Sequence, residues 1–262
     1  LTPVRGLSLT ANVGLTNENT RYNALYSRFG SQSSTDGLAY VSHDRTFAVN
    51  NQYLAEYKTD FYGSLHTLNV LAGYEVYKLK EQFLEGQNDR LFDPYIGELG
   101  NADGSSSTQL SSYTADYITQ GFLGRAQYDY DGRYSVSATV RADGSSKFAA
   151  GNQWGIFPSA AASWTISNEP WLEDATWLDN LKLRYSYGTA GNNNIPSNVS
   201  SLLFQANQTQ WISMGNTWWG TTTVGGKSIM PNPDLTWETT VSHNIGLDYA
   251  FLNSRINGSF EV

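Results

Sequence analysis

The sequence has no cysteine, few charged residues and no long apolar run, and each absence excludes a class of protein. Without cysteine, the chain has no disulfide framework, thiolate nucleophile or cysteine-based zinc site. The longest apolar runs contain only four residues, as in Tyr249–Leu252. Because a membrane-spanning helix needs about 20 apolar residues, we expect no transmembrane helix.

Positive charge is also scarce. The 16 basic and 24 acidic residues give a net charge of −8. Since nucleic-acid binding needs a basic face that neutralises phosphates, we expect no nucleic-acid partner. An aromatic content of 14% with only 15% charged residues excludes global disorder. The first residues, from Leu1, show no targeting signal, so the chain is either mature or cut from a larger protein.

The residues that are abundant favour an all-β fold. The chain holds 24 Gly, 17 Tyr, 11 Phe and 8 Trp beside 2 Met, which suits strands and turns better than helices. From Arg133 to Arg141, apolar residues alternate with polar ones, so the two sets point to opposite faces of a strand. The apolar set is Tyr134, Val136, Ala138 and Val140.

The same alternation predicts nine strands, several of them ten or more residues long. A bilayer-crossing strand needs about 9–11 residues, whereas the usual strand has about 5–6. The predicted strands are 6–17, 46–58, 66–79, 119–130, 133–142, 154–167, 181–190, 237–251 and 254–262. In the eighth strand, only His243 interrupts the apolar set.

Long and short connections alternate between these strands. Long polar loops are predicted near 18–45, 80–118, 143–153 and 191–236. Tight turns are predicted at 59–65, 131–132 and 252–253, and the exception is a link of about a dozen residues at 167–180. In an antiparallel meander this places the long loops at one end, which is typical of transmembrane β-barrels. A soluble β-sandwich, carbohydrate-binding or adhesive, remains the alternative.

A series of motifs in the second half carries a family resemblance. In order, the motifs are Phe122-Leu123-Gly124-Arg125, Arg141-Ala142-Asp143-Gly144-Ser145-Ser146-Lys147-Phe148, Gly155-Ile156-Phe157-Pro158-Ser159, Trp164-Thr165-Ile166-Ser167-Asn168-Glu169, Leu181-Lys182-Leu183-Arg184-Tyr185, Gly191-Asn192 and Asn232-Pro233-Asp234-Leu235-Thr236-Trp237-Glu238. Taken together over residues 121–262, they closely resemble the barrel of SusC-like (SusC/RagA) TonB-dependent outer-membrane transporters. The first 120 residues show only generic barrel-strand character.

The resemblance implies a part of a larger transporter. Such a barrel has about 22 strands and holds an N-terminal plug that contacts TonB. Residues 1–262 are therefore expected to be a partial β-barrel domain of the bacterial outer membrane that lacks the plug and the remaining strands. The resemblance further implies import of glycans or oligopeptides, a SusD-like surface lipoprotein as partner, and membrane lipid around the apolar face. We expect neither enzymatic activity nor a cofactor, because no acid pair or nucleophile is positioned for catalysis.

The predicted substrate-binding residues lie in the long segment 191–236. Indole faces stack on sugar rings or on peptide side chains, and nearby amides supply hydrogen-bond donors and acceptors. The candidates are Trp211, Trp218, Trp219, Asn207 and Gln210. The alternative is that these tryptophans fold the loop on itself or cover a partner protein.

The remaining polar and aromatic candidates have structural interpretations. Charged residues of the family-like motifs are expected to be solvated or paired with neighbours across the barrel wall rather than to bind ligand; these are Arg125, Arg141, Asp143 and Glu238. The three histidines, His43, His66 and His243, have no metal-ligand spacing. The tryptophans near strand ends are expected to form interfacial belts; these are Trp164, Trp171, Trp177 and Trp237.

Overall fold

The computed structural model describes residues 4–26, 28–29, 37–103, 108–196, 199, 222–224, 227–229 and 232–262. Strands dominate, because alternating side chains suit an extended backbone with two different faces. The strands are β1 Leu7–Tyr26, β2 Leu38–Phe61, β3 His66–Asp89, β4 Gln109–Tyr130, β5 Tyr134–Ser145, β6 Trp154–Thr165, β7 Leu178–Asn192, β8 Thr222–Val224, β9 Lys227–Ile229, β10 Glu238–Phe251 and β11 Ile256–Glu261. The described ranges also contain three short 3-10 helices, η1 Leu99–Asn101, η2 Ile166–Asn168 and η3 Pro170–Leu172.

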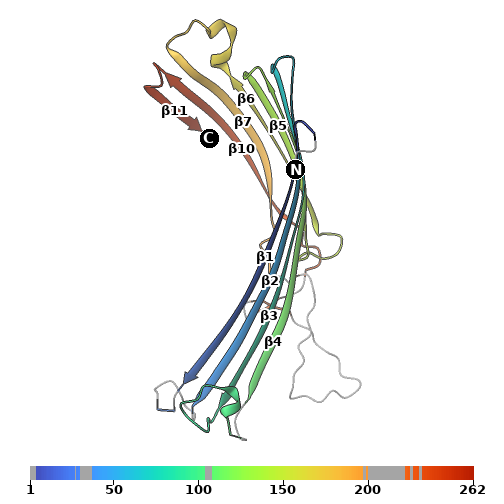
Figure 1. The fold of residues 1–262 in the computed structure, drawn as a ribbon, viewed down its shortest axis with the longest axis vertical. Coiled ribbons are helices and arrows are strands. Elements are labelled where there is room, and N and C mark those ends of the chain that lie inside the picture. The colour runs from blue at the N-terminus through green and yellow to red at the C-terminus, as the bar shows by residue number, and fades with distance from the viewer. Residues whose placement is uncertain are drawn as a thin grey trace. The chain divides into compact units, whose positions relative to one another are not determined.

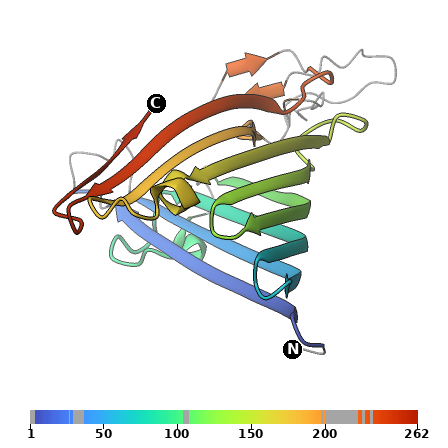
Figure 2. The ribbon, with the colours of Figure 1, turned by 90° about the horizontal axis from the view of Figure 1, so that it is seen from above.

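Nine of the strands form one antiparallel meander. The order is β1-β2-β3-β4-β5-β6-β7-β10-β11, so chain neighbours are sheet neighbours apart from the β8–β9 hairpin (Figures 1 and 2). Each of the nine strands overlaps one of the nine predicted from the sequence, which confirms the all-β barrel-type sheet. No helix in the described ranges is long and apolar enough to cross a membrane.

The predicted boundaries are wrong for the first two long loops. Residues 18–26 and 38–45 belong to β1 and β2, and most of 80–118 belongs to β3 and β4. These strand ends carry polar residues on both faces, as in Thr16-Asn17-Glu18-Asn19-Thr20. Apolar residues are few and irregularly spaced in these strand ends, so hydrophobic alternation is too weak there to reveal the strands. The connection 143–153 shortens to 146–153, and β7 extends to Asn192.

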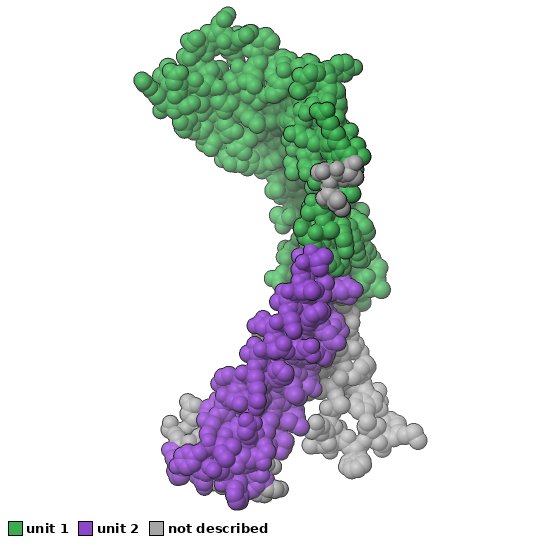
Figure 3. Space-filling view, in the orientation of Figure 1, with its two compact units in different colours: residues 1–12, 51–76, 119–262 green, residues 13–50, 77–118 purple. Residues whose placement is uncertain are grey.

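The chain divides into two compact units. Unit 1 contains residues 1–12, 51–76 and 119–262, and unit 2 contains residues 13–50 and 77–118 (Figure 3). Unit 2 therefore consists of one half of each of β1 to β4 together with their connections.

The turns of unit 1 use the backbone conformations that hairpins require. Asp131 and Gly132 both have positive φ, 52° and 63°, as in a two-residue hairpin loop whose twist matches the flanking strands. Leu252, Asn253 and Ser254 also have positive φ at the β10–β11 turn. The exceptional link predicted at 167–180 is confirmed as a longer connection, because η2 and η3 lie within it.

Strand register in unit 1 separates an apolar face from a polar face. Val136 lies opposite Tyr128 and Ala162, whereas Ser137 lies opposite Gln127 and Ala161. The apolar face comprises Tyr128, Val136, Ala138, Val140, Ala160, Ala162, Tyr185 and Ile245. The polar face comprises Arg125, Gln127, Ser135, Ser137, Thr139, Arg141, Ser163, Arg184, Asn244 and Asp248.

The apolar face is the more exposed of the two. Val136 and Val140 are 50% and 51% exposed, while the residues that alternate with them on β5 are half-buried. A soluble sandwich would show the opposite, because its apolar faces pack against each other. The part of unit 1 that the structure describes therefore places no second layer over this row.

Candidate functional site

The predicted substrate-binding residues are not in the described part of the chain. Trp211, Trp218, Trp219, Asn207 and Gln210 all lie within residues 200–221, outside the described residues. The structure instead describes the roots of this segment, where it leaves β7 and where it enters β10. Those roots belong to one packed cluster.

A cluster of three aromatic residues forms the centre of this region. Phe148 and Phe157 are 2% and 6% exposed, and the ring of Trp237 contacts both, with centroid distances of 5.3 and 5.5 Å. Trp237 Nε1 donates a hydrogen bond to the carbonyl oxygen of Gln153 at 2.9 Å. Trp237 was predicted to belong to an interfacial belt, and its contacts show a packing role in this cluster instead.

Two glycines make room for the cluster. A methyl group added at Gly155 or at Gly191 would overlap the ring of Phe157. Both glycines belong to motifs that carried the family resemblance. They are needed because the Phe157 ring lies against the backbone itself, which no residue with a Cβ atom permits.

Hydrogen bonds from the β5–β6 connection hold both roots of the long segment. Asn152 Nδ2 donates to the carbonyl oxygen of Pro233 at 3.0 Å, and Lys147 Nζ donates to that of Asn193 at 3.5 Å. The connection 146–153 thus joins the start of the segment to its end. A ligand-binding loop needs such rigid roots, because positioned side chains depend on a fixed scaffold.

Two arginines on the polar face, Arg141 and Arg184, each form ion pairs with two carboxylates, and we call each set an arginine bridge. Arg141 Nε lies 2.8 Å from Asp143, and Arg141 Nη2 lies 3.4 Å from Glu75 on β3. To reach β3, the guanidinium crosses β4 at Gly121, which has no side chain in its way. The strands β3, β4 and β5 are thereby joined by charged side chains as well as by backbone pairing.

The second bridge joins β7, β10 and β11. Arg184 Nε and Nη2 donate to Asp248 at 3.0 and 3.1 Å, and Arg184 Nη1 lies 3.5 Å from Glu261 on β11. The guanidinium packs over Gly246, where a Cβ atom would meet it within 3 Å. Both bridges are partly exposed, so they stabilise the sheet only modestly.

The other charges singled out from the sequence also have partners. Arg125 donates to Gln127 at 3.1 Å, and Gln127 donates to Asp129 at 3.1 Å along the same strand. Glu238 accepts a hydrogen bond of 2.8 Å from Asn192 across β7 and β10. Each of these motif charges has a structural partner, but Arg125 pairs along its own strand and not across the wall.

The polar face also contains a small hydroxyl-lined hollow of about 260 Å³. Small side chains form it because Ser135, Ser137, Ser163 and Ser186 come from adjacent strands. Lys182 contributes a positive charge at its side. The hollow offers hydrogen-bond donors and acceptors, and Ala161, Ala162 and Tyr185 add apolar surface to its lining.

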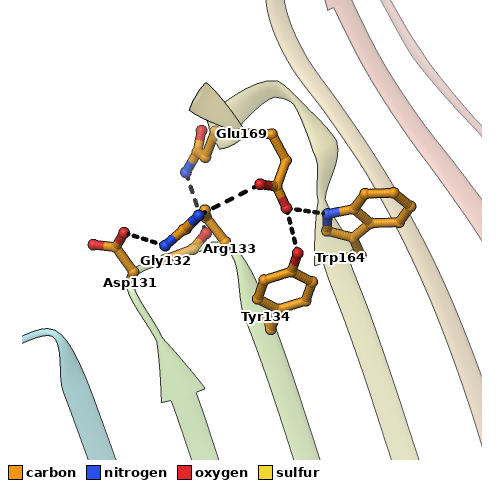
Figure 4. Close-up of polar contacts among 7 residues, drawn as sticks. Asp131, Gly132, Arg133, Tyr134, Trp164 and Glu169 are labelled. Carbon is orange, nitrogen blue, oxygen red and sulfur yellow. Dashed lines mark hydrogen bonds and ion pairs between the residues drawn. The ribbon is translucent and has the colours of Figure 1, made fainter. Parts of the chain in front are cut away.

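At the end of the sheet with the short turns, Glu169 is the centre of a second cluster (Figure 4). It is 2% exposed, and its Oε1 accepts hydrogen bonds from Tyr134 Oη at 2.5 Å and from Trp164 Nε1 at 2.7 Å. Its Oε2 lies 3.4 Å from Arg133 Nη1, and Arg133 Nη2 lies 2.9 Å from Asp131. The cluster joins the β4–β5 turn to the link between β6 and β7.

The hydrogen bonds to Glu169 favour its charged form. The Tyr134 hydroxyl first of all, with the Trp164 indole and the Arg133 guanidinium, lowers the pKa of Glu169 below the ordinary value, against the opposing effect of burial. Sequence reasoning quoted Glu169 only as part of a motif. A glutamate directly before Pro170, at the start of a short helix, was the available signal, but its partners come from two other segments, Arg133-Tyr134 and Trp164.

The histidines have aromatic and hydroxyl partners. His66 Nδ1 lies 2.6 Å from Tyr128 Oη, and His243 Nδ1 lies 2.9 Å from Tyr185 Oη. Among the described residues, no group of three or more histidines and carboxylates could hold a metal ion. Aromatic stacking also fixes two of the predicted belt tryptophans, since Trp164 stacks on Tyr134 and Trp177 on Phe251.

Comparison with known proteins gives a consistent result. The family described as TonB dependent receptor-like, beta-barrel, matches residues 4–262. TonB-dependent receptor P26 of Formosa agariphila is 32% identical over 244 residues, which cover 89% of this chain and 24% of that protein. TonB-dependent receptor SusC of Bacteroides thetaiotaomicron is 34% identical over 194 residues, which cover 73% of this chain and 18% of that protein.

Solved structures match over the whole chain. The structure of the RagAB peptide transporter aligns with a TM-score of 0.86 at 27% identity, covering 100% of this chain and 28% of that chain. Structures of the RagAB peptide importer in its open-open and closed-closed states each align with a TM-score of 0.85 at 26% identity. The chain thus spans about a quarter or less of the length of the curated relatives described above.

Proposed function

Because this chain belongs to the TonB-dependent receptor β-barrel family, with SusC-like relatives, we propose that it forms part of the wall of an active importer. The family places the chain in the bacterial outer membrane. In this proposal residues 1–262 are a segment of the barrel domain of a longer protein. The longer protein imports glycans or oligopeptides, with energy supplied by TonB acting on a plug domain.

The observation that carries this proposal is the exposed apolar face. Its side chains are the most exposed on β5, while charged and hydroxyl side chains occupy the opposite, more covered face. Lipid is the environment that makes such an arrangement favourable, because the apolar row then contacts hydrocarbon and the polar face lines the lumen. The soluble sandwich alternative needed that row to be buried, and it is wrong.

Glycans or oligopeptides are proposed as substrates because of the matching structures and the chemistry of the predicted binding residues. The matching RagAB structures are those of a peptide transporter and a peptide importer, which favours oligopeptides for this chain as well. The amides and indoles predicted to bind substrate, among them Trp211, Trp218 and Trp219, suit either glycans or peptides. We propose that the roots held by Asn152 and Lys147 position this segment at the entrance to the lumen.

Two partners belong to the same proposal. A SusD-like surface lipoprotein is proposed to close over the long loops, by analogy with the SusC-like relatives. TonB is proposed to act from the opposite side of the membrane through the plug. The chain is proposed to bind and pass its substrate unchanged, without catalysis.

Uptake by the complete protein tests the function. The full-length gene is expressed in a strain that lacks it, and growth on defined oligosaccharides or oligopeptides as sole nutrient is compared with and without TonB. We expect TonB-dependent uptake that is reduced when Trp211, Trp218 and Trp219 are all changed to Ala. Unchanged uptake in the triple variant would remove these residues from the proposed site, and absence of TonB dependence would overturn the importer.

A further inference from the structure

Unit 2 presents a sheet face on which aromatic rings and acidic residues gather. Tyr22 on β1 contacts Tyr40 on β2 with ring centroids 6.0 Å apart, and Phe83 on β3 contacts Tyr113 on β4 at 5.3 Å. We call these four residues the aromatic patch. Tyr22 and Tyr113 are each 54% exposed, whereas Tyr40 and Phe83 are half-buried. Each exposed ring is therefore held in place by a neighbouring ring.

A polar hollow lies beside these rings. It has a volume of about 140 Å³ and is lined by Tyr40, Glu85, Gln87, Gln109 and Ser111. Tyr40 Oη donates a hydrogen bond of 2.7 Å to Glu85. The hollow supplies amide, hydroxyl and carboxylate groups, which together can bind the backbone and the cationic groups of a peptide.

The opposite face of the same strands is covered by the β3–β4 connection. Arg21, next to Tyr22 in the chain, pairs with Glu98 at 3.2 Å. A Cβ atom at Gly86, next to Glu85, would meet the side chain of Leu99. Because neighbouring strand residues point to opposite faces, the aromatic patch lies on the face that this connection leaves open.

Acidic and basic residues of unit 2 also lie on opposite faces of the strands. By alternation along the strands, Glu18, Asp44, Glu81 and Glu85 share the face of the aromatic patch, and Arg21, Arg45, Lys78 and Lys80 lie on the other. Within the described ranges, none of these four acids forms an ion pair. The open face is thus aromatic and negative, which disfavours anionic ligands and attracts cationic ones.

We propose that the aromatic patch is a binding site for oligopeptides that carry lysine or arginine. This inference rests on the proposed function and names its substrate class. Cationic side chains stack over Tyr22 and Tyr113 by cation–π attraction, and carboxylates such as Glu81 and Glu85 neutralise them. Three strand spacings, about 14 Å, separate β1 from β4, which is the length of about four residues of an extended peptide.

Direct binding to the purified full-length protein tests the site. The probes are fluorescent decapeptides in which lysine alternates with glycine, the same peptide with glutamate in place of lysine, and a neutral linear hexasaccharide. We expect the lysine peptide to bind most tightly. In the double variant Tyr22→Ala with Tyr113→Ala, its affinity is expected to fall about tenfold or more, while Phe at both positions retains most of it. Glu81→Gln with Glu85→Gln weakens binding and reduces its salt dependence.

Tyr95→Ala is the matched control, because Tyr95 is 79% exposed in the connection that covers the other face. Equal affinity of the wild-type and double tyrosine variants for the lysine peptide would overturn the site. Tighter binding of the glutamate peptide or of the hexasaccharide would overturn the substrate class. A different result would contradict the importer function and leave the binding site intact. In that case the lysine peptide binds to the aromatic patch but does not enter cells in a TonB-dependent way.

Discussion

Single residues in this protein matter where they let a larger side chain lie against the backbone. Gly155 and Gly191 accommodate Phe157, and Gly121 and Gly246 accommodate the guanidinium groups of two arginines. In a single-layered sheet with few buried side chains, such contacts replace the interior of a globular domain. A glycine in these motifs is therefore a packing residue rather than a source of flexibility.

Gly191→Ala is expected to destabilise the protein by about 1–3 kcal/mol, because the added methyl group overlaps the Phe157 ring and forces it to move. The measurement is denaturant unfolding of the full-length protein in detergent. Gly124→Ala is the control, since a Cβ atom at Gly124 meets nothing within 4 Å. Equal stability of the two variants would contradict the packing role of Gly191.

The contacts of Glu169 predict how the stability of the protein depends on pH. Its pKa is lowered in the folded state, chiefly by the Tyr134 hydroxyl, so its stabilising effect is complete above the ordinary value of 4.5 and is lost as the pH falls through the folded-state value. We expect Glu169→Gln to lower stability at neutral pH and to flatten the loss of stability between neutral and acidic pH. Thermal unfolding at several pH values from neutral to acidic measures this change in stability. Glu173→Gln, at an exposed position, is the control. A pH profile identical to that of the wild-type protein would exclude this role.

At the scale of elements, charged side chains join strands that are not neighbours. Arg184 links β7 to β11 across β10, and Arg141 links β5 to β3 across β4. The sequence predicted each of the nine strands and the pairing of the motif charges, because alternation and turn chemistry are local signals. It did not predict the halves of β1 to β4 that lie in unit 2, where the few apolar residues are scattered among polar ones.

Arg184→Gln is expected to weaken the C-terminal strands, because Asp248 and Glu261 lose their shared partner. The bridge is partly exposed, so the decrease in thermal stability should be modest and should shrink in 1 M salt, where the screening length is about 3 Å. Arg255→Gln, in the exposed β10–β11 turn, is the control. An effect of the same size at low and high salt would assign the role of Arg184 to packing.

For the whole molecule, the decisive property is which face of the sheet contacts lipid. Val140→Arg introduces a charge on the apolar face, at a cost of about 2–4 kcal/mol if the position lies near the bilayer midplane. Thr139→Arg places the same side chain on the polar face. We expect folded protein in the outer membrane to fall for the first variant and to remain near the wild-type level for the second. Equal amounts of both would contradict the assignment of the faces.

The sequence by itself determined the order of the nine main strands, their two faces and the family, because alternation, turn residues and ordered motifs are properties of neighbouring positions. Only the tertiary structure decided which distant motifs meet. Trp237 contacts Phe148, Glu169 has partners from two separate segments, and Tyr22 and Tyr113 lie on one open face although they belong to separate strands. The physical reason is that strand register and side-chain reach set these contacts, and neither quantity is encoded within any single segment.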